Sequence, residues 1–169
     1  MGFDNNARAL QASPIHIERY FEAAELIAAQ AVRMVVPQLD CDLNGVSPGC
    51  FQPWLADLGT RLWRRPIAED EMSRFTQLFD EGIASHETEH EALARVLEAL
   101  LQSPFFLYRI EVGVPTGQAD VFELTDYEVA SRLSFLAWRT TPDAELLDAA
   151  EAGSLRNPEG RLEQLSRMM

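Results

Sequence analysis

Apolar residues recur every three or four positions along most of the chain, which is the spacing of one face of an α-helix. The strongest pattern of this kind lies between Glu91 and Arg109. Its apolar positions are Leu93, Val96, Leu97, Leu100 and Leu101, followed beyond Ser103-Pro104 by Phe105, Phe106, Leu107 and Tyr108. We therefore expect a buried helix around which the other helices pack.

Three helices are predicted before this one. The first begins at Ser13-Pro14, an N-cap followed by proline, and ends before Pro37. The second follows the irregular residues 37–50 and ends near Arg64-Arg65-Pro66, and the third ends at Gly82. The inward positions of the first helix are expected to be Ile17, Tyr20, Phe21, Ala24, Ile27, Ala28, Ala31 and Val35.

Three more helices are predicted towards the C-terminus. A capping box at Thr125 to Glu128 starts one, Thr141-Pro142 starts a second that ends at Gly153, and Asn157-Pro158 starts the last. No strand-like alternation longer than a few residues occurs. The fold class is therefore all-α, with about seven helices in two small helical subdomains, 1–112 and 123–169, joined by a linker at 113–122 that contains Pro115 and two glycines.

Composition narrows the classes of function. The 169 residues are 47% hydrophobic and carry a formal net charge of −13, which disfavours binding to nucleic acid and to anionic membrane surfaces. No apolar run reaches the roughly 20 residues that a membrane-spanning helix needs. We therefore expect no nucleic-acid partner and no membrane insertion.

A zinc-peptidase pattern, H-E-x-x-H, occurs at His86-Glu87-Thr88-Glu89-His90. It would require both histidines on one helical face, with Glu87 as general base. However, Thr88 and Glu91 form a capping box of their own, so the helix is expected to start at Thr88 and to leave His86 outside it. A solvated helix start is therefore preferred over zinc at His86, Glu87 and His90.

A calcium-loop pattern, D-x-D-x-N-G, is formed by Asp40, Asp42, Asn44 and Gly45. The twelfth position of the loop is Phe51, where an EF-hand places a bidentate glutamate. A plain Asx-rich turn is thus the preferred interpretation, and calcium binding at Asp40, Asp42 and Asn44 is the alternative.

The two cysteines, Cys41 and Cys50, lie in the same loop and are compatible with a disulfide or with two free thiols. No C-x-x-C-H motif for haem attachment is present. Several arginines flank aromatic residues and offer an anion-binding cleft, but arginines near helix ends more often satisfy terminal carbonyls. These are Arg64, Arg65, Arg109, Arg132 and Arg139. No catalytic residue and no cofactor site is identified.

Four stretches resemble secreted proteins of planctomycete and myxobacterial type, which are built of helical modules of unknown function and often associated with cytochrome c domains. GFDNNARALQASPIHIERYFEAAELIA resembles the end of the module numbered fifteen-eighty-seven. RLWRRPIAEDEM and LLQSPFFLYRIE resemble two motifs of module fifteen-ninety-five, with Trp63 in place of the usual Phe and Ala68 in place of a capping Thr. LTDYEVASRLSFLAWRTTPDAELLDAAEAGSL resembles the opening of module fifteen-ninety-two.

The resemblance implies export to the periplasm or the extracellular space, and this oxidising setting favours a Cys41–Cys50 disulfide. It also implies that both ends are truncated. The expected partners are the remainder of the same polypeptide, with a cytochrome c domain as one candidate. We thus expect a structural or interaction module, and the alternative is part of an enzyme, either a haem-linked oxidoreductase subunit or an extracellular polymer hydrolase.

Overall fold

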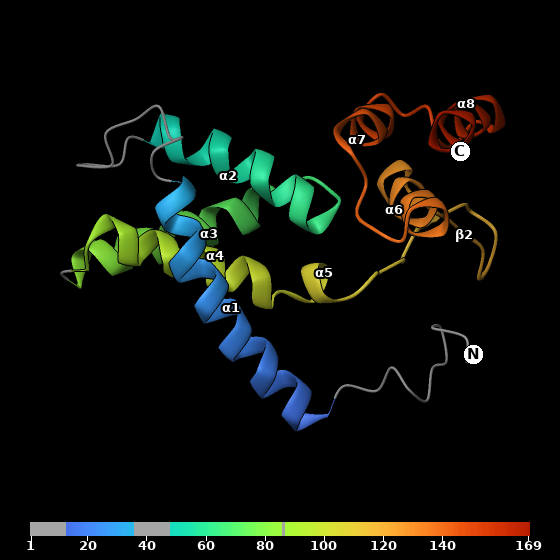
Figure 1. Ribbon diagram of the computed structural model, residues 1–169. Coiled ribbons are helices and arrows are strands. Elements are labelled where there is room, and N and C mark those ends of the chain that lie inside the picture. The colour runs from blue at the N-terminus through green and yellow to red at the C-terminus, as the bar shows by residue number, and fades with distance from the viewer. Residues whose placement is uncertain (1–12, 36–47, 86) are drawn as a thin grey trace.

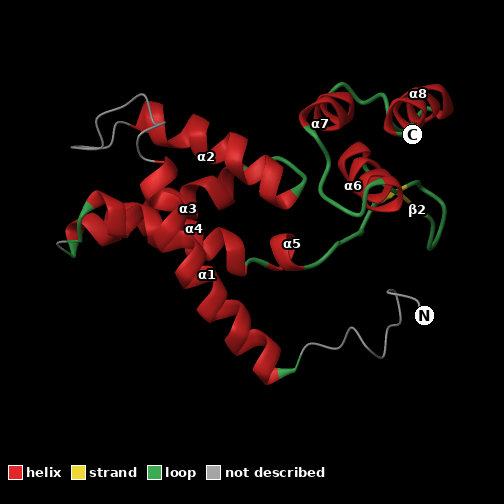
Figure 2. Cartoon of the chain, in the orientation of Figure 1, coloured by secondary structure: helices red, strands yellow, loops and turns green. Residues whose placement is uncertain are grey.

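The structure is a computed structural model that describes residues 13–35, 48–85 and 87–169. Within these ranges the chain forms eight helices and one two-stranded hairpin, which confirms the all-α class (Figure 2). The helices are α1 Pro14–Val35, α2 Pro48–Trp63, α3 Glu69–Ala84, α4 Glu89–Gln102, α5 Pro104–Leu107, α6 Asp126–Ala137, α7 Ala144–Glu151 and α8 Pro158–Met168. The strands are β1 Val114–Pro115 and β2 Phe122–Glu123.

The helices gather into two hydrophobic clusters along the chain (Figure 1). In the first cluster α4 is the central helix and packs mainly against α1 and α3. Its buried face carries Leu93, Val96, Leu97 and Leu100, as the apolar spacing predicts. The second cluster contains α6, α7 and α8, and its fully buried residues include Ala130, Leu146 and Leu155.

The start of α4 follows from its capping box. The Thr88 hydroxyl accepts the Glu91 amide at 3.3 Å, and the Glu91 carboxylate accepts the Thr88 amide at 2.8 Å. Two amide groups that have no partner within the helix are satisfied in this way. The predicted start at Thr88 is confirmed, and α6 begins at Thr125 by the same device.

Gly82 does not end the third helix, which is where the prediction was wrong. The helix α3 continues to Ala84, and Gly82 is buried against α4. A Cβ atom at Gly82 would lie 3.0 Å from the Cβ of Ala92. The glycine therefore permits close packing of α3 on α4, and no left-handed conformation is involved.

Two other helix starts also differ from the prediction. The helix α2 begins at Pro48, inside the range expected to be irregular. The helix α7 begins at Ala144 instead of Thr141-Pro142, because the Asp143 carboxylate caps it by accepting the Leu146 amide at 3.0 Å. Near the expected linker, Val114 pairs with Glu123 in an antiparallel hairpin.

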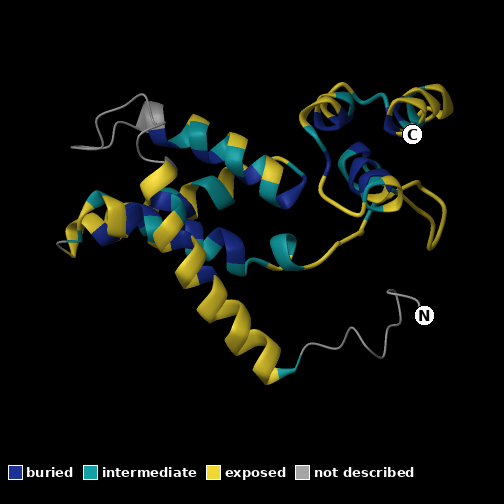
Figure 3. Ribbon diagram, viewed as in Figure 1, coloured by how far each residue is buried: buried dark blue, intermediate teal, exposed yellow. Residues whose placement is uncertain are grey.

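The helix α1 has the predicted bounds but not the predicted burial. Among the residues of its apolar face whose burial the structure describes, Ala24, Ala28 and Val32 are buried, at 3%, 1% and 3% exposure. Ile17, Tyr20 and Phe21 lie on the same face and are exposed at 47%, 41% and 50%. The N-terminal half of α1 runs beyond the first cluster, and Figure 3 shows it almost entirely exposed. The face is apolar along its whole length, but only its C-terminal half is covered.

Candidate functional site

The exposed side chains Ile17, Tyr20 and Phe21 form one continuous apolar surface, here called the α1 stripe. Phe21 lies four residues after Ile17 and three before Ala24, so the α1 stripe is in line with the buried Ala24 and Ala28. It therefore extends the α1–α4 interface without interruption. Two other exposed apolar residues of α1, Ile15 and Leu26, point to the opposite side of the helix, as their spacing requires.

Arginines occupy the junction between the two clusters. Arg64 follows the last residue of α2 and adopts a left-handed backbone conformation with φ of 60°. Its guanidinium donates hydrogen bonds to the carbonyl oxygens of Leu62, Phe105 and Tyr108. The residue as a whole is only 6% exposed. Burial, together with the nearby charge of Arg109, lowers the pKa of Arg64. The left-handed turn therefore directs this side chain onto the carbonyl end of α5.

Two of these arginines make cation–π contacts with the ring of Phe135 in α6. The guanidinium carbon of Arg109 lies 4.9 Å from the centre of its ring, and that of Arg64 lies 6.0 Å from it. Arg132 adds a cross-link by pairing with Glu111. The junction is thus held by cation–π contacts and an ion pair, whereas each cluster has its own apolar core.

A cavity of about 270 Å³ lies at this junction. Trp63, Arg64, Phe105, Tyr127, Glu128 and Ser131 are among its lining residues. The charged groups in it already have partners within the protein. Arg65 is bidentate to Glu71 at 2.7 and 2.9 Å and stacks on Phe105, with its guanidinium carbon 3.9 Å from the ring centre. Arg64 therefore acts on carbonyls, in line with the preferred interpretation of these arginines, whereas Arg65 and Arg132 pair with carboxylates.

Glu128 of α6 accepts hydrogen bonds from the backbone that leads into the second cluster. One carboxylate oxygen accepts the amides of Val112 and Gly113, at 2.6 and 3.0 Å, and the other accepts the Thr125 amide at 2.7 Å. Partial burial raises the pKa of Glu128, but these amide hydrogen bonds outweigh it, so that the pKa lies below its usual value. Gly113 has φ of 69°, and a Cβ there would lie 2.7 Å from the Glu123 carbonyl oxygen. Only glycine fits this approach without strain.

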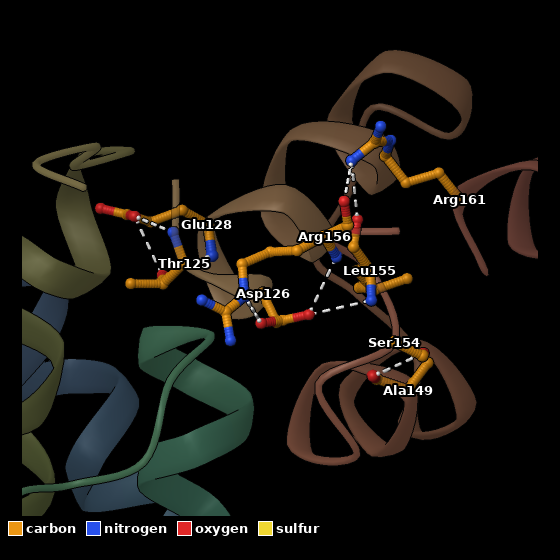
Figure 4. A network of polar contacts seen from close by, with 8 residues as sticks. All are labelled: Thr125, Asp126, Glu128, Ala149, Ser154, Leu155, Arg156 and Arg161. Atoms are coloured by element: carbon orange, nitrogen blue, oxygen red, sulfur yellow. Dashed lines mark hydrogen bonds and ion pairs between the residues drawn. The ribbon is translucent and has the colours of Figure 1, made fainter. Parts of the chain in front are cut away.

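Asp126, one residue after the cap of α6, organises the turn between α7 and α8 (Figure 4). Its Oδ1 accepts the amides of Leu155 and Arg156 at 2.9 and 3.0 Å, and its Oδ2 pairs with the Arg156 side chain at 2.8 Å. Asp126 is 7% exposed. Sequence reasoning missed this residue, because its partners are 29 and 30 positions away. All of these contacts hold the second cluster together.

Two of the three zinc-pattern residues, Glu87 and His90, lie in the described part of the chain. Glu87 pairs with Arg95, and its Oε2 is buried without a hydrogen-bond partner among the described residues. His90 is exposed on the first turn of α4, and His86 lies outside the described residues. Where the structure describes the chain, no three His, Cys, Asp or Glu side chains are grouped as metal ligands would be. Glu87 is thus held by an arginine in the arrangement described.

The calcium and cysteine predictions fall in a part of the chain that the structure does not describe. Asp40, Cys41, Asp42 and Asn44 lie between the ranges given above, and the side chain of Cys50 is likewise not described. Both predictions therefore stay as they are. In the described ranges, no helix has the length and apolar character needed to cross a bilayer.

Comparisons with family models confirm the three modules of the motif-based resemblance and their order. Three consecutive segments are similar to modules of unknown function, and they occur in the expected order. Residues 1–33 match PSD3 (DUF1587), residues 50–111 match PSD5 (DUF1595) and residues 124–169 match PSD4 (DUF1592), each described as a protein of unknown function. Comparison with curated proteins and with solved structures finds no match.

Proposed function

We propose that the chain is a structural or interaction module of a secreted, cytochrome-associated protein built of several such modules. The observation that supports this role is the α1 stripe of Ile17, Tyr20 and Phe21, which continues a buried helix interface into solvent. Contiguous exposed apolar surface of this kind marks interaction sites in soluble proteins. The α1 stripe would be covered by other modules of the same polypeptide.

The geometry explains why these residues suit recognition. Tyr20 and Phe21 are large and lose little side-chain entropy on binding, so aromatic residues contribute strongly at interfaces. They stand on a 22-residue helix whose other half is fixed by α4. The α1 stripe is therefore presented on a rigid support, which lowers the entropic penalty of association.

The test is co-purification of this chain with the separately expressed remainder of its polypeptide. The double variant Tyr20→Ser/Phe21→Ser should reduce the affinity at least about tenfold, because truncating aromatic hot-spot residues at an interface removes about 2 kcal/mol or more. A double variant on the opposite side of the helix, Ile15→Ser/Leu26→Ser, serves as the matched control and should bind normally. Equal binding by all three proteins would contradict the proposal.

The proposed export also leads to a separate prediction about the redox state of the two cysteines. In an oxidising compartment Cys41 and Cys50 should form a disulfide, closing a short loop and stabilising the protein by about 2–3 kcal/mol. Mass measurement with and without reduction should then differ by two hydrogens, and Cys50→Ser should abolish that difference. The same sample can be tested for calcium at Asp40 and Asp42, since a bound ion would raise the melting temperature at millimolar calcium.

A further inference from the structure

Negatively charged side chains line the edge of the α1 stripe beside Phe21. Glu18 and Glu25 lie three before and four after Phe21, so the three side chains follow one ridge of α1. Both glutamates are exposed, and neither has an ion pair among the described residues. The remaining acidic residue nearby, Glu22, pairs with Arg19 at 2.6 Å. This leaves an apolar surface with an acidic border.

The opposite edge of the α1 stripe carries no acidic residue. His16 and Ala23 lie four before and three after Tyr20, and Ile27 lies seven after it. A partner helix lying along the stripe would therefore meet negative charge on one side and a neutral or apolar edge on the other. Complementary recognition calls for basic side chains on only one flank of that partner.

These charges disfavour a second copy of the chain as the occupant. If two α1 helices packed antiparallel about a two-fold axis, the same edge of each helix would meet, and Glu18 of one would face Glu25 of the other. Like charges so placed destabilise the pair. The net charge of −13 on each chain adds to this repulsion.

We propose that the α1 stripe receives an amphipathic helix with an apolar seam and a basic flank. This inference rests on the proposed function, because it specifies the partner of the same surface. The α1–α4 contact shows that this face of α1 already accepts a helix, and the α1 stripe continues it. The apolar seam would cover Ile17, Tyr20 and Phe21, and the basic flank would lie beside Glu18 and Glu25.

The experiment uses two synthetic 21-residue helical peptides with the same leucine seam, one with lysines on the flank and one with glutamates. Binding to the full chain is measured by titration calorimetry at low salt. The lysine peptide should bind about tenfold more tightly, since two charge pairs replace two repulsions. In the variant Glu18→Lys/Glu25→Lys the preference should reverse, and salt should weaken both preferences. Phe21→Ser should weaken binding of either peptide.

The remaining outcomes overturn this inference in distinguishable ways. Equal affinity for both peptides would refute the basic flank and leave the proposed interaction surface intact. If neither peptide bound while the remainder of the polypeptide did, the partner would not be a helix. If Phe21→Ser affected neither, both proposals would fail. Concentration-dependent dimerisation that Phe21→Ser abolishes would identify a second copy as the occupant.

Discussion

The indole Nε1 of Trp63 donates a hydrogen bond to the carbonyl oxygen of Leu100 at 3.1 Å, joining the end of α2 to the end of α4. Both residues are buried, at 6% and 0% exposure. The ring also packs against Phe75 and Phe105, with centroid distances of 5.6 and 5.4 Å. Sequence reasoning noted Trp63 only as a replacement for the usual Phe. The hydrogen bond gives the tryptophan a specific role, since phenylalanine has no N–H group.

Trp63→Phe should therefore lower the free energy of unfolding by about 1–3 kcal/mol, because it leaves a small cavity and removes one of the two hydrogen bonds that the Leu100 carbonyl accepts, the other coming from the Ser103 amide at 3.4 Å. Chemical denaturation would measure this. Trp54→Phe is the matched control, since Trp54 is only half-buried and its indole N–H has no hydrogen bond in the described part of the chain. A Trp54 effect equal to that of Trp63 would contradict the role of the hydrogen bond.

Two substitutions at Arg64 distinguish the contribution of its side chain to stability from that of its backbone conformation. Arg64→Gly removes the hydrogen bonds to the three carbonyl oxygens but relieves the backbone strain at φ of 60°. Arg64→Ala removes the same hydrogen bonds and keeps that strain. We expect Ala to destabilise by about 2–3 kcal/mol and Gly by roughly 1 kcal/mol less. Arg139 has φ of 58° and is exposed, so Arg139→Gly should be neutral or mildly stabilising. Equal effects of Gly and Ala at Arg64 would show that the backbone is not strained.

Asp126→Asn should weaken the second cluster. The variant loses the charge opposite the half-exposed Arg156 side chain and one of two acceptor oxygens, and weakening the hydrogen bonds of the buried Asp126 in this way reduces stability by about 1–3 kcal/mol. Hydrogen exchange should show faster opening of the Leu155 and Arg156 amides, while α4 amides are unchanged. Asp148→Asn, at an exposed position of α7, is the control and should leave all of these rates unaltered.

Stability should fall in acid because several carboxylates have lowered pKa values in the folded protein. Hydrogen bonds from Arg65 lower the pKa of Glu71, and hydrogen bonds from Arg167 lower the pKa of Asp143. The pKa of Glu128 is lowered as described above. Their unfolded values are about 4.3 for Glu and 3.9 for Asp, so the stabilisation is complete above roughly pH 5. It should then be lost as the pH falls through the lower, folded values.

Urea denaturation between pH 2 and 7 would measure this dependence. Glu128→Gln should flatten the acid limb, because one group with a lowered pKa no longer titrates. Glu159→Gln on the exposed start of α8 changes the net charge equally and serves as the control. A steeper limb in Glu128→Gln would contradict the assigned direction of the pKa shift.

Local signals were predictable from sequence, and long-range ones were not. The caps at Thr88 and Thr125 were found because a capping box lies within four residues. The burial of α1 was overestimated because periodicity identifies an apolar face but not where the covering helix ends. Gly82 was misread because packing against Ala92 and helix termination both favour glycine. The partners of Arg64 and Asp126 depend on residues about 30 to 45 positions away.

The pairing of α1 with α4 also affects how the protein folds during its synthesis. The ribosome must add 67 residues after Val35 before Gln102, the last residue of α4, is made. At roughly 5–20 residues per second this takes about 3–13 s, far longer than a helix needs to form. During that interval Ala24, Ala28 and Val32 have no α4 to cover them. We expect nascent chains to be most dependent on chaperones in this window.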